Sequence, residues 1–318
     1  MGSRATYRLA TAPAQCATAA LMLRPAAFGF NTETAASNAF QQQTQAADAA
    51  VRARDEFDAM VVQLRTAGLR VCVVEDDPLP PRPDAVFPNN WVSFHADGTV
   101  VLYPMLTPNR RAERRPEVLA QVATELGFVE TRRIDLTHHE TAGRFLEGTG
   151  SLVLDAVQRV AYANRSSRTD ESLVREWCQL MDYEAVIFDA ATPDGRPVYH
   201  TNVLLWIGAR AAGIGLDWIA AADRQRVLHK LQSSGRTVLT LPQNSLQHFA
   251  GNMLELRAGS SDDAQHVLVL SAQAAQSLPH VLRQQLEACT DQLCVVPIPL
   301  IEQLGGGSVR CMLAEVRT

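Results

Sequence analysis

The stretch GGGSVRCMLAEV, residues 305–316, determines how the rest of the chain is interpreted. Three glycines let the backbone approach a ligand closely or adopt positive φ. A short apolar segment with period-two alternation follows them and indicates a strand. Cys311 therefore lies where a loop becomes a strand, which suits a nucleophile. The alternative is that Cys311 is one of six small buried thiols, since free cysteine is among the most buried residue types.

A repeated unit is visible in the sequence that precedes this stretch. It consists of an apolar strand, a turn marked by glycine or proline, a second strand, a helical segment and a further strand. A first strand is predicted at 20–24, and strand pairs at 84–94 with 100–103, 145–154 with 160–163, 199–206 with 212–218 and 249–256 with 267–270. Helices are predicted at 37–67, 110–126, 170–180, 221–231 and 272–288. The last helix, a strand at 293–297 and the Cys311 strand complete a fifth unit.

Five such units predict an α/β fold in which sheet modules surround a common axis and the first and last strands close the ring. The expected architecture is a five-bladed, pseudo-symmetric α/β propeller of strand-strand-helix-strand units. Residues at one end of such a ring converge on a central cavity. The alternative is a plain α/β sandwich without this symmetry.

Composition limits the classes of function. Apolar residues make up 47% of the 318 residues and charged residues 20%, which is typical of a globular protein. A net charge of −5 provides no basic surface for nucleic acid. No apolar run approaches the roughly 18 to 20 residues that span a bilayer, so we expect no membrane association.

The six cysteines show neither a C-x-x-C pair nor a dense disulfide framework. We therefore expect reduced thiols, no structural metal and a cytoplasmic location. The whole chain, 1–318, is predicted to be one catalytic domain whose first 15 or so residues form a flexible tail. The oligomeric state stays open, with a homodimer as the alternative to a monomer.

A few polar residues interrupt the apolar strands at equivalent places in the units: Asn89, Asn90, Glu147, His200, Asn252 and Cys311. Taken singly, each has an ordinary explanation. A histidine in a strand is more often a core or surface residue, Glu147 suits a sheet edge, and Asn90 can bond its own turn. Together, at corresponding positions of a repeat, they predict one shared site.

Six segments of the chain, in the order of the family, resemble the guanidino-group modifying superfamily. They are MLRP with FGFN (22–25 and 28–31), PDAVFPNNW (83–91), LEGTGS (146–151), YHTNV (199–203), GNM (251–253) and the Cys311 strand. This superfamily has the five-bladed pentein fold and includes arginine deiminases, dimethylarginine dimethylaminohydrolases and amidinotransferases. Within it, the sequence is most similar to the bacterial arginine deiminase-related, citrulline-utilisation hydrolase type.

The resemblance implies Cys311 as the nucleophile, His200 as general acid and base, and Glu147 as the carboxylate that orients His200 and contacts a substrate nitrogen. The chemistry is consistent with these roles. An amidine or ureido carbon is a poor electrophile, and a covalent intermediate divides its hydrolysis into two easier steps. A histidine that serves both steps needs a pKa near the working pH, and a cationic substrate lowers the pKa of a neighbouring thiol. No metal or organic cofactor is expected.

The same resemblance implies the substrate contacts. Asp84 corresponds to a pocket aspartate that accepts from a guanidinium or a urea N–H. Asn90 stands where many relatives have a second aspartate. An amide removes one negative charge and can donate as well as accept, which favours a neutral ureido group such as citrulline or a ureido intermediate that is hydrolysed again.

Arg114 and Arg168 lie where relatives bind the carboxylate of the amino acid, a task that suits a guanidinium. Arg111, Arg115 and Arg165 are alternatives to them. Asn31 is expected to contact the reacting group, and backbone near Gly305 the α-amino group.

The sequence thus predicts a hydrolase of linear C–N bonds in arginine- or citrulline-like amino acids, with a Cys311 intermediate and release of ammonia. Arginine, methylated arginine, citrulline and agmatine stay open as substrates, and citrulline and ornithine as products. An amidinotransferase with the same cysteine is one alternative. A non-catalytic amino acid binding protein is another, although binding alone requires no thiol.

Overall fold

The computed structural model describes residues 14–43, 48–259 and 263–318. They form a mixed α/β fold. The flexible tail predicted for the first 15 or so residues falls largely on 1–13, outside the described ranges. Gln15 itself is buried, and its side-chain amide donates to the carbonyl oxygens of Leu154 and Ile207.

Across the described ranges, the strands form five units with one shared pattern, in which the middle strand pairs antiparallel with the first strand and parallel with the third. The units are β15 (Ala314–Val316), β1 (Ala19–Arg24) and β2 (Arg70–Glu75); β3 (Val92–Phe94), β4 (Thr99–Leu102) and β5 (Arg132–Asp135); β6 (Val153–Asp155), β7 (Val160–Asn164) and β8 (Glu184–Phe188); β9 (Leu205–Ile207), β10 (Ala211–Ile214) and β11 (Thr237–Thr240); β12 (Leu254–Ala258), β13 (Gln265–Ser271) and β14 (Gln292–Val296). The chain ends meet in one unit, where β15 pairs with β1. A pair between Val316 and Phe94 joins this unit to the next in a six-stranded sheet.

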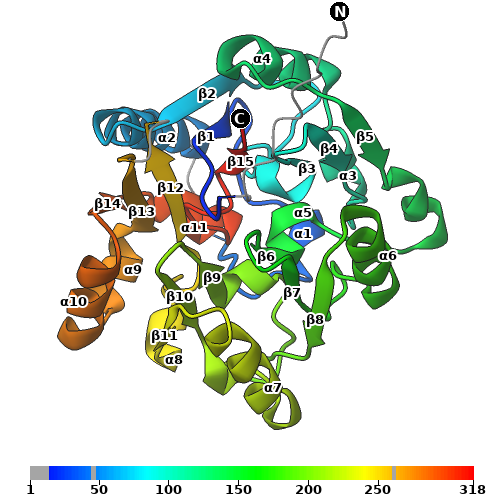
Figure 1. Cartoon of the computed structure of the whole chain (residues 1–318). Helices are drawn as coiled ribbons and strands as arrows, with labels where there is room; N and C mark the ends of the chain where they lie inside the picture. The colour runs from blue at the N-terminus through cyan, green and yellow to red at the C-terminus, as the bar shows by residue number, and fades with distance from the viewer. Residues whose placement is uncertain (1–13, 44–47, 260–262) are drawn as a thin grey trace, which may run out of the picture.

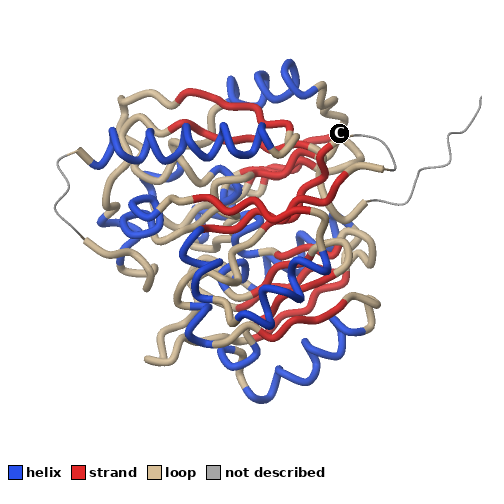
Figure 2. Tube along the Cα trace, turned by 90° about the vertical axis from the view of Figure 1, so that its left-hand side faces the viewer, coloured by secondary structure: helices blue, strands red, loops and turns tan. Residues whose placement is uncertain are grey.

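Each parallel pair requires a crossover, and a helix provides it in every unit. The crossover helices are α2 (Ala49–Thr66), α4 (Pro116–Leu126), α6 (Glu171–Met181), α7 (Ala221–Gln232) and α9 (Ala272–Ser277) with α10 (His280–Cys289). Figure 1 shows the units following one another around the middle of the molecule, with α2, α4, α6, α7 and α10 at the outer rim. In the perpendicular view of Figure 2, the strands run through the centre and long helices lie outside them.

Several predicted helix boundaries are wrong. The helix predicted at 37–67 begins only at Ala49. Residues 36–43 instead form turns and irregular backbone, and their hydrogen bonds are not those of a helix. Residues 44–47 of that prediction lie outside the described ranges. The helices predicted at 110–126 and 272–288 are each divided near a proline, Pro116 and Pro279, which lacks the N–H that a helix interior needs. The last helix and the strand at 293–297 belong to the β12 unit, and the Cys311 strand belongs to the unit of β1.

Short helices occupy the places where the first strand of several units was predicted to begin. The remaining helices are α1 (Thr32–Ala35), α3 (Pro108–Arg111), α5 (Gly148–Ser151), α8 (Gln243–Leu246), α11 (Pro299–Gly305), and the 3₁₀ helices η1 (Pro88–Asn90), η2 (Thr137–Ala142), η3 (Thr201–Val203) and η4 (Leu216–Trp218). Thus η1, α5 and η3 replace the beginnings of the strands predicted at 84–94, 145–154 and 199–206.

The polar residues that interrupt the repeat share one structural position. Asn90 ends η1, Glu147 directly precedes α5, and His200 directly precedes η3. Asn252 lies two residues before β12, and Cys311 three residues before β15. Each of these side chains therefore comes from the turn that leads into the first strand of its own unit.

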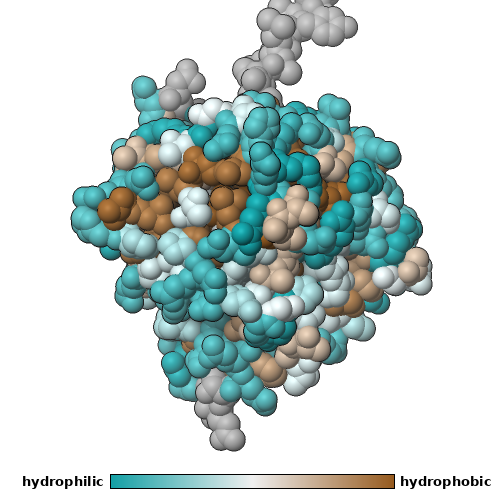
Figure 3. Space-filling model, turned by 90° about the horizontal axis from the view of Figure 1, so that it is seen from below, coloured by the Kyte–Doolittle hydropathy of each residue, from teal (hydrophilic) through white to brown (hydrophobic). Residues whose placement is uncertain are grey.

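The core lies between the sheets and the outer helices. Its largest fully buried side chains include Trp91, Trp177, Tyr103, Phe57 and Phe188. The face in Figure 3 is mostly polar, with apolar side chains gathered in one part of it. No helix in the described ranges is long and apolar enough to cross a membrane. All six cysteines are described, and each is a free thiol.

Candidate active site

A narrow pocket collects residues from several units of the fold. Its lining is formed by Asn38, Asp84, Phe87, Asn90, Arg110, Arg168, Tyr199, His200, Gly305, Gly306, Gly307 and Cys311. Among these are Asp84, Asn90, Arg168, His200, Gly305 and Cys311, which the sequence analysis singled out. The pocket thus brings together residues as far apart in the chain as Asn38 and Cys311.

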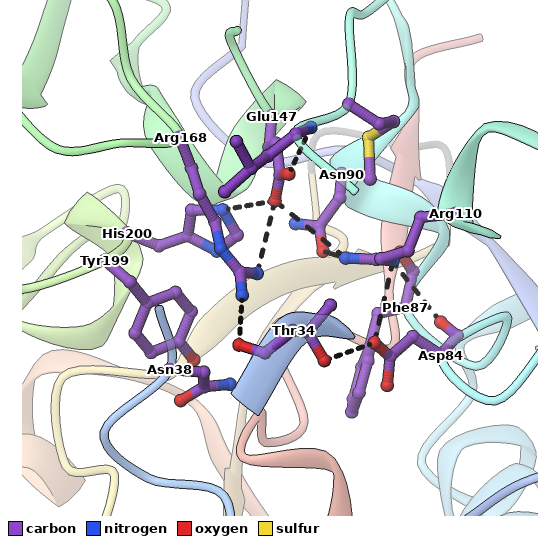
Figure 4. A network of polar contacts seen from close by, with 12 residues as sticks. Thr34, Asn38, Asp84, Phe87, Asn90, Arg110, Glu147, Arg168, Tyr199 and His200 are labelled. Atoms are coloured by element: carbon purple, nitrogen blue, oxygen red, sulfur yellow. Dashed lines mark hydrogen bonds and ion pairs between the residues drawn. The ribbon is translucent and has the colours of Figure 1, made fainter. Parts of the chain in front are cut away.

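Glu147 and His200 form a buried hydrogen-bonded pair beside this pocket. His200 Nε2 lies 2.9 Å from Glu147 Oε2, and both side chains are almost fully buried. The other carboxylate oxygen, Oε1, accepts the backbone N–H of Leu106 at 3.1 Å. Figure 4 shows Arg168 and Arg110 approaching the same carboxylate, at 3.4 Å and 3.9 Å from Oε2. Glu147 is therefore held in place by one histidine, one backbone amide and two guanidinium groups.

The surroundings of this pair determine its protonation. Burial alone would raise the pKa of Glu147, but the charge of Arg168, the hydrogen bond with His200 and the charge of Arg110 outweigh it and hold the pKa well below its ordinary value. Burial lowers the pKa of His200 to about 4, below the value near the working pH that was expected, although the hydrogen bond and charge of Glu147 act in the opposite direction. The pair is thus a carboxylate and a neutral imidazole at neutral pH. Because a carboxylate only accepts, Nε2 carries the proton and Nδ1 has a free lone pair.

Gly150 provides the space that the histidine ring requires. A Cβ atom at this position would lie 2.7 Å from His200 Nδ1 and 2.6 Å from Asn90 Nδ2. Gly148, in the same short helix, has a φ of +49°, and a Cβ there would lie 2.2 Å from the carbonyl oxygen of Asn89. The GTG sequence after Glu147 therefore allows α5 to pack directly against the backbone of η1 and the ring of His200.

The Cys311 thiol lies among amide groups. Asn252 Nδ2 donates to Sγ at 3.3 Å and Asn202 Nδ2 at 3.6 Å. Burial raises the pKa of Cys311, while its backbone contact with Ser308, the two asparagines and the charge of Arg310 oppose this increase. The free thiol is therefore protonated at neutral pH. The amide N–H groups of Asn252 and Asn202 can stabilise a thiolate by hydrogen bonding.

Asp84 offers an unsatisfied acceptor. Its Oδ2 accepts from Asn31 Nδ2 at 2.7 Å and from the Thr34 hydroxyl at 3.1 Å. Its Oδ1 is buried and has no hydrogen-bond partner among the described residues. Because a buried unpaired carboxylate oxygen is costly, this atom is suited to receive a ligand N–H. Asn31 caps α1 and orients Asp84, and it is not among the residues that line the pocket within the described chain.

Arg110 is the main site residue that was not predicted. It forms a bidentate pair with Glu113, with Nε–Oε1 at 2.8 Å and Nη2–Oε2 at 2.9 Å. Its Nη1 donates to the amide oxygen of Asn90 at 2.8 Å. Arg110 is only 2% exposed, so this positive charge is fixed inside the pocket next to Asn90.

Arg168 and Arg114, both predicted to bind a substrate carboxylate, differ in position. Arg168 lines the pocket, lies over the ring of Tyr199 and donates to the Ser37 hydroxyl. Arg114 pairs with Glu140 at 2.6 Å and does not line the pocket formed by the described residues. The alternatives Arg111, Arg115 and Arg165 pair with Glu140, Asp77 and Glu171 respectively.

Gly305 lies at the pocket wall against an aromatic ring. A Cβ there would lie 2.7 Å from the ring of Phe87. Its carbonyl oxygen accepts from Asn38 Nδ2 at 3.4 Å, and the next carbonyl, of Gly306, accepts from the Tyr199 hydroxyl. The backbone at this place thus presents carbonyl acceptors that Asn38 and Tyr199 hold in position.

The residues that sequence reasoning missed are Asn38, Phe87, Arg110, Tyr199 and Asn202. Tyr199 and Asn202 stand within the YHTNV segment, next to the predicted His200. Arg110 begins an arginine-rich run in which nothing in the sequence distinguishes the member that lines the pocket from its neighbours. Asn38 fell within the helix predicted at 37–67, and no signal in the sequence pointed to it.

Comparisons with known proteins agree with this geometry. The family model described as N,N dimethylarginine dimethylhydrolase, eukaryotic, matches residues 24–318. No curated protein matches the chain by sequence.

The fold is shared with three solved structures of low sequence identity. The N-terminal domain of ArgZ bound to its substrate, an arginine dihydrolase from the ornithine-ammonia cycle in Cyanobacteria, has a TM-score of 0.70 and 17% identity over 94% of this chain and 97% of its own. The same domain covalently bound to a reaction intermediate gives 0.71 and 16% over 93% and 97%. A dimethylarginine dimethylaminohydrolase adduct with 4-chloro-2-hydroxymethylpyridine gives 0.61 and 14% over 95% and 100%.

The family match begins at the last residue of β1 and covers the other strands, the Glu147–His200 pair and the Cys311 turn. The chain therefore belongs to the N,N dimethylarginine dimethylhydrolase family of the guanidino-group modifying, or pentein, superfamily, and it is a hydrolase of C–N bonds other than peptide bonds.

Proposed function

We propose that this chain is a single catalytic domain with the five-bladed propeller arrangement, and that it hydrolyses the ureido or amidine group of a citrulline- or arginine-like amino acid through a covalent bond to Cys311. The observation that carries the proposal is one pocket that contains Cys311, with two amide donors on its sulfur, and His200, held by Glu147.

The proposed reaction has two steps. In the first, the Cys311 thiol gives its proton to His200 Nδ1, and Sγ bonds to the central carbon of the substrate. The C–N bond then breaks, and His200 returns the proton to the departing ammonia or amine. In the second step, water gives a proton to His200 and attacks the same carbon, and as the C–S bond breaks His200 returns that proton to Sγ. When the substrate is citrulline, the carbamate released in this step loses carbon dioxide to give ornithine. The ionised Glu147 stabilises the imidazolium that forms transiently in both steps.

A neutral ureido group suits the electrostatics of the pocket. Asp84 Oδ1, to which no group in the described ranges donates, can accept a ureido or guanidinium N–H. The permanent charge of Arg110 beside Asn90 favours an oxygen acceptor over a second cation. These features support hydrolysis of a ureido group, either of citrulline itself or of a ureido intermediate formed from arginine. They speak against a reaction in which citrulline is the final product.

The other end of the substrate requires a cation for its carboxylate. Arg168 is the proposed partner, since it lines the pocket and carries both a charge and planar donors. Its present contacts with Ser37 and the carbonyl oxygen of Thr34 would be exchanged for the carboxylate. Arg114 is paired with Glu140, and we do not propose that it contacts the substrate directly.

The test is to incubate the purified protein separately with arginine, dimethylarginine, citrulline and agmatine and to identify products by mass spectrometry. Ornithine from citrulline is expected, and ornithine from arginine as well would indicate two successive hydrolyses. Accumulation of citrulline from arginine or dimethylarginine would contradict the proposed ureido preference and leave the roles of Cys311, His200 and Glu147 intact.

Two alternatives predict different outcomes. An amidinotransferase would turn over arginine only when an amine acceptor is added. A binding protein would bind ligand without any turnover, whether or not its thiol is present. For a hydrolase, Cys311→Ala should lower kcat by at least about a thousandfold and leave substrate binding measurable by calorimetry.

A further inference from the structure

A second group of reactive side chains lies away from the pocket. Cys16, Glu255 and His266 place a thiol sulfur, a carboxylate oxygen and an imidazole nitrogen within 4.8 Å of one another. They come from three segments: the chain before β1, strand β12 and strand β13. We propose that these three residues bind a divalent transition-metal ion, with zinc as the best match.

The donor set supports this assignment. Thiolate, imidazole and carboxylate are the three side-chain donors that zinc takes in proteins, and a thiolate with a carboxylate balances its double charge. Sites with three protein ligands leave a fourth position for water. The side chain of His266 is 21% exposed, which gives a fourth ligand access, whereas Cys16 and Glu255 are 4% and 3% exposed.

The distances are close to those of a bound ion. Two ligands of a tetrahedral zinc lie about 3.3 to 3.8 Å apart, given metal–ligand bonds of about 2.0 to 2.3 Å. Cys16 Sγ lies 3.4 Å from Glu255 Oε1, within this range. His266 Nδ1 donates to the same oxygen at 2.6 Å, a hydrogen-bond distance that lengthens when the metal replaces the shared proton. Cys16 Sγ and His266 Nδ1 lie within 4.8 Å of each other, so metal binding requires the imidazole to adjust its distance to both other ligands.

The supporting contacts hold the ligands in place. The backbone N–H of His266 donates to Asp291 at 2.8 Å, and its carbonyl accepts from the Thr290 hydroxyl at 2.8 Å. Glu255 accepts the backbone N–H of Ala209 at 3.4 Å, and a Cβ at Gly208 would lie 2.1 Å from its Oε2. Contacts of this kind orient ligands around a metal and raise its affinity.

A second combination of histidine and carboxylate is less suitable. His138, His139 and Glu176 also approach one another within 4.8 Å. However, Arg144 donates to His139 Nδ1 at 2.7 Å, and Nε2 is engaged with Glu176 at 3.2 Å, so both ring nitrogens of His139 are occupied and a cation is already present. The site at Cys16 has no such competing donor on its thiol among the contacts described.

Binding at this site would join the segment before β1 to the β12–β13 hairpin. The carbonyl oxygen of Ala17 already accepts the backbone N–H of Arg257 at 2.8 Å, so the segment runs along the edge of β12. A metal would add a link to Glu255 and His266. The expected consequence is a metal-dependent rise in the unfolding temperature of the whole chain, independent of any reaction at Cys311.

The test uses Co²⁺ as a spectroscopic probe in the Cys311→Ala background, which removes the other candidate thiol ligand. One equivalent of Co²⁺ should bind and produce a thiolate-to-cobalt charge-transfer band, and Zn²⁺ should displace it. Adding Cys16→Ala should abolish the band and weaken Zn²⁺ binding by more than about a hundredfold. The matched control is Cys294→Ala in the same background, since Cys294 is a buried thiol outside the cluster, and it should retain the band.

His266→Gln provides a second variant at a more exposed position, and it should also weaken binding if the assignment is correct. Absence of a charge-transfer band in Cys311→Ala would overturn the proposal. A charge-transfer band that persists in both the Cys16→Ala and the His266→Gln variants would also overturn it. The same holds if Cys294→Ala removes the band as completely as Cys16→Ala does. Circular dichroism of each variant without metal confirms that it is folded before the comparison.

Discussion

Asn90 is the residue whose environment differs most from what its sequence position suggests. Its amide oxygen accepts from Arg110, and its amide nitrogen donates to Asn89 Oδ1 at 3.0 Å. Nε and Nη2 of Arg110 pair with Glu113, while its Nη1 faces Asn90. The amide and the guanidinium together form a polar wall that can donate to a substrate oxygen, which supports the proposed preference for a ureido group.

Asn90→Asp tests this interpretation directly. The substitution adds a carboxylate near Asp84 and Glu147, and a cationic guanidinium should then be favoured over a neutral ureido group. We expect the ratio of kcat/KM for arginine to kcat/KM for citrulline to rise about tenfold, which corresponds to about 1.4 kcal/mol. Steady-state kinetics with both substrates measures the ratio, and the urea midpoint checks that the variant is folded. An unchanged ratio would mean that Asn90 does not distinguish the two groups.

At the scale of elements, the turns that precede the first strands position the chemistry. η1, α5, η3 and the Cys311 turn each deliver one polar side chain to the pocket or its edge. Their close packing depends on glycines, which have no side chain, above all on Gly150 between Asn90 and His200. The catalytic geometry is therefore a property of backbone contacts between units.

Gly150→Ala should separate His200 from Asn90. The added Cβ would lie 2.6 to 2.7 Å from both side chains, closer than real Cβ contacts, so the ring must move. Because a misplacement of about 1 Å can reduce a rate about a hundredfold, we expect a loss of that order in kcat. Gly29→Ala is the matched control, since no described atom lies within 4 Å of a Cβ there, and it should leave kcat unchanged. Equal activity of the two variants would argue against a precise role for α5.

The helix α11 is linked to the Cys311 turn through a buried carboxyl group. The Ser308 hydroxyl donates to Glu302 Oε1 at 2.6 Å, and the Ser308 carbonyl accepts the backbone N–H of Cys311 at 2.9 Å. Burial raises the pKa of Glu302 to about 7, although its hydrogen bond with Ser308 opposes the increase. The folded protein therefore keeps a proton on Glu302 that the unfolded chain releases near its ordinary pKa of 4.5.

Glu302→Gln should change how stability depends on pH. A raised folded-state pKa contributes stability that is fully present below about 4.5 and is lost as pH rises through about 7. Relative to the variant, the free energy of unfolding of the natural chain should fall by about 3 kcal/mol between pH 4.5 and 7.5. Urea unfolding at several pH values measures this difference. The exposed Glu287→Gln serves as the control and should show no such slope; parallel curves for the natural chain and Glu302→Gln would refute the assignment.

At the scale of the whole molecule, contacts between units hold the pocket residues together. Asp155 of the β6–β7 hairpin is 1% exposed and is paired with Arg236, which precedes β11 of the next unit. Arg236 also donates to Gln15 Oε1 at 3.2 Å, so the segment before β1 joins this network. The network does not include any residue that lines the pocket.

Arg236→Met should therefore destabilise the protein without altering its chemistry. It leaves the Asp155 carboxylate buried without its cation, and breaking such a pair costs about 3 to 5 kcal/mol. Denaturant unfolding should show this loss, while kcat/KM at a temperature well below the transition stays unchanged. Arg175→Met removes an exposed pair with Glu171 on α6 and should cost less than about 0.5 kcal/mol. A comparable loss of unfolding free energy in Arg236→Met and Arg175→Met would contradict the distinction between the buried and the exposed ion pair.

Much of the site followed from the repeat in the sequence. Glu147, His200 and Cys311 were recognisable because they interrupt apolar strands at equivalent positions, and Asp84 and Asn90 because they stand in a specific motif. Arg168 was identified by resemblance and lies in the pocket as expected. Their assigned roles remain predictions for the kinetics to test.

The sequence by itself determined the order of the strands and of the crossover helices, because hydrophobic periodicity and turn residues act locally. Only the tertiary structure decided that Arg110 and not Arg114 enters the pocket, because this depends on which carboxylate each guanidinium meets: Glu113 for Arg110 and Glu140 for Arg114. The same holds for the cluster of Cys16, Glu255 and His266, whose members are separated by up to 250 residues. Distances between such side chains are set by the packing of whole units, and no local pattern encodes them.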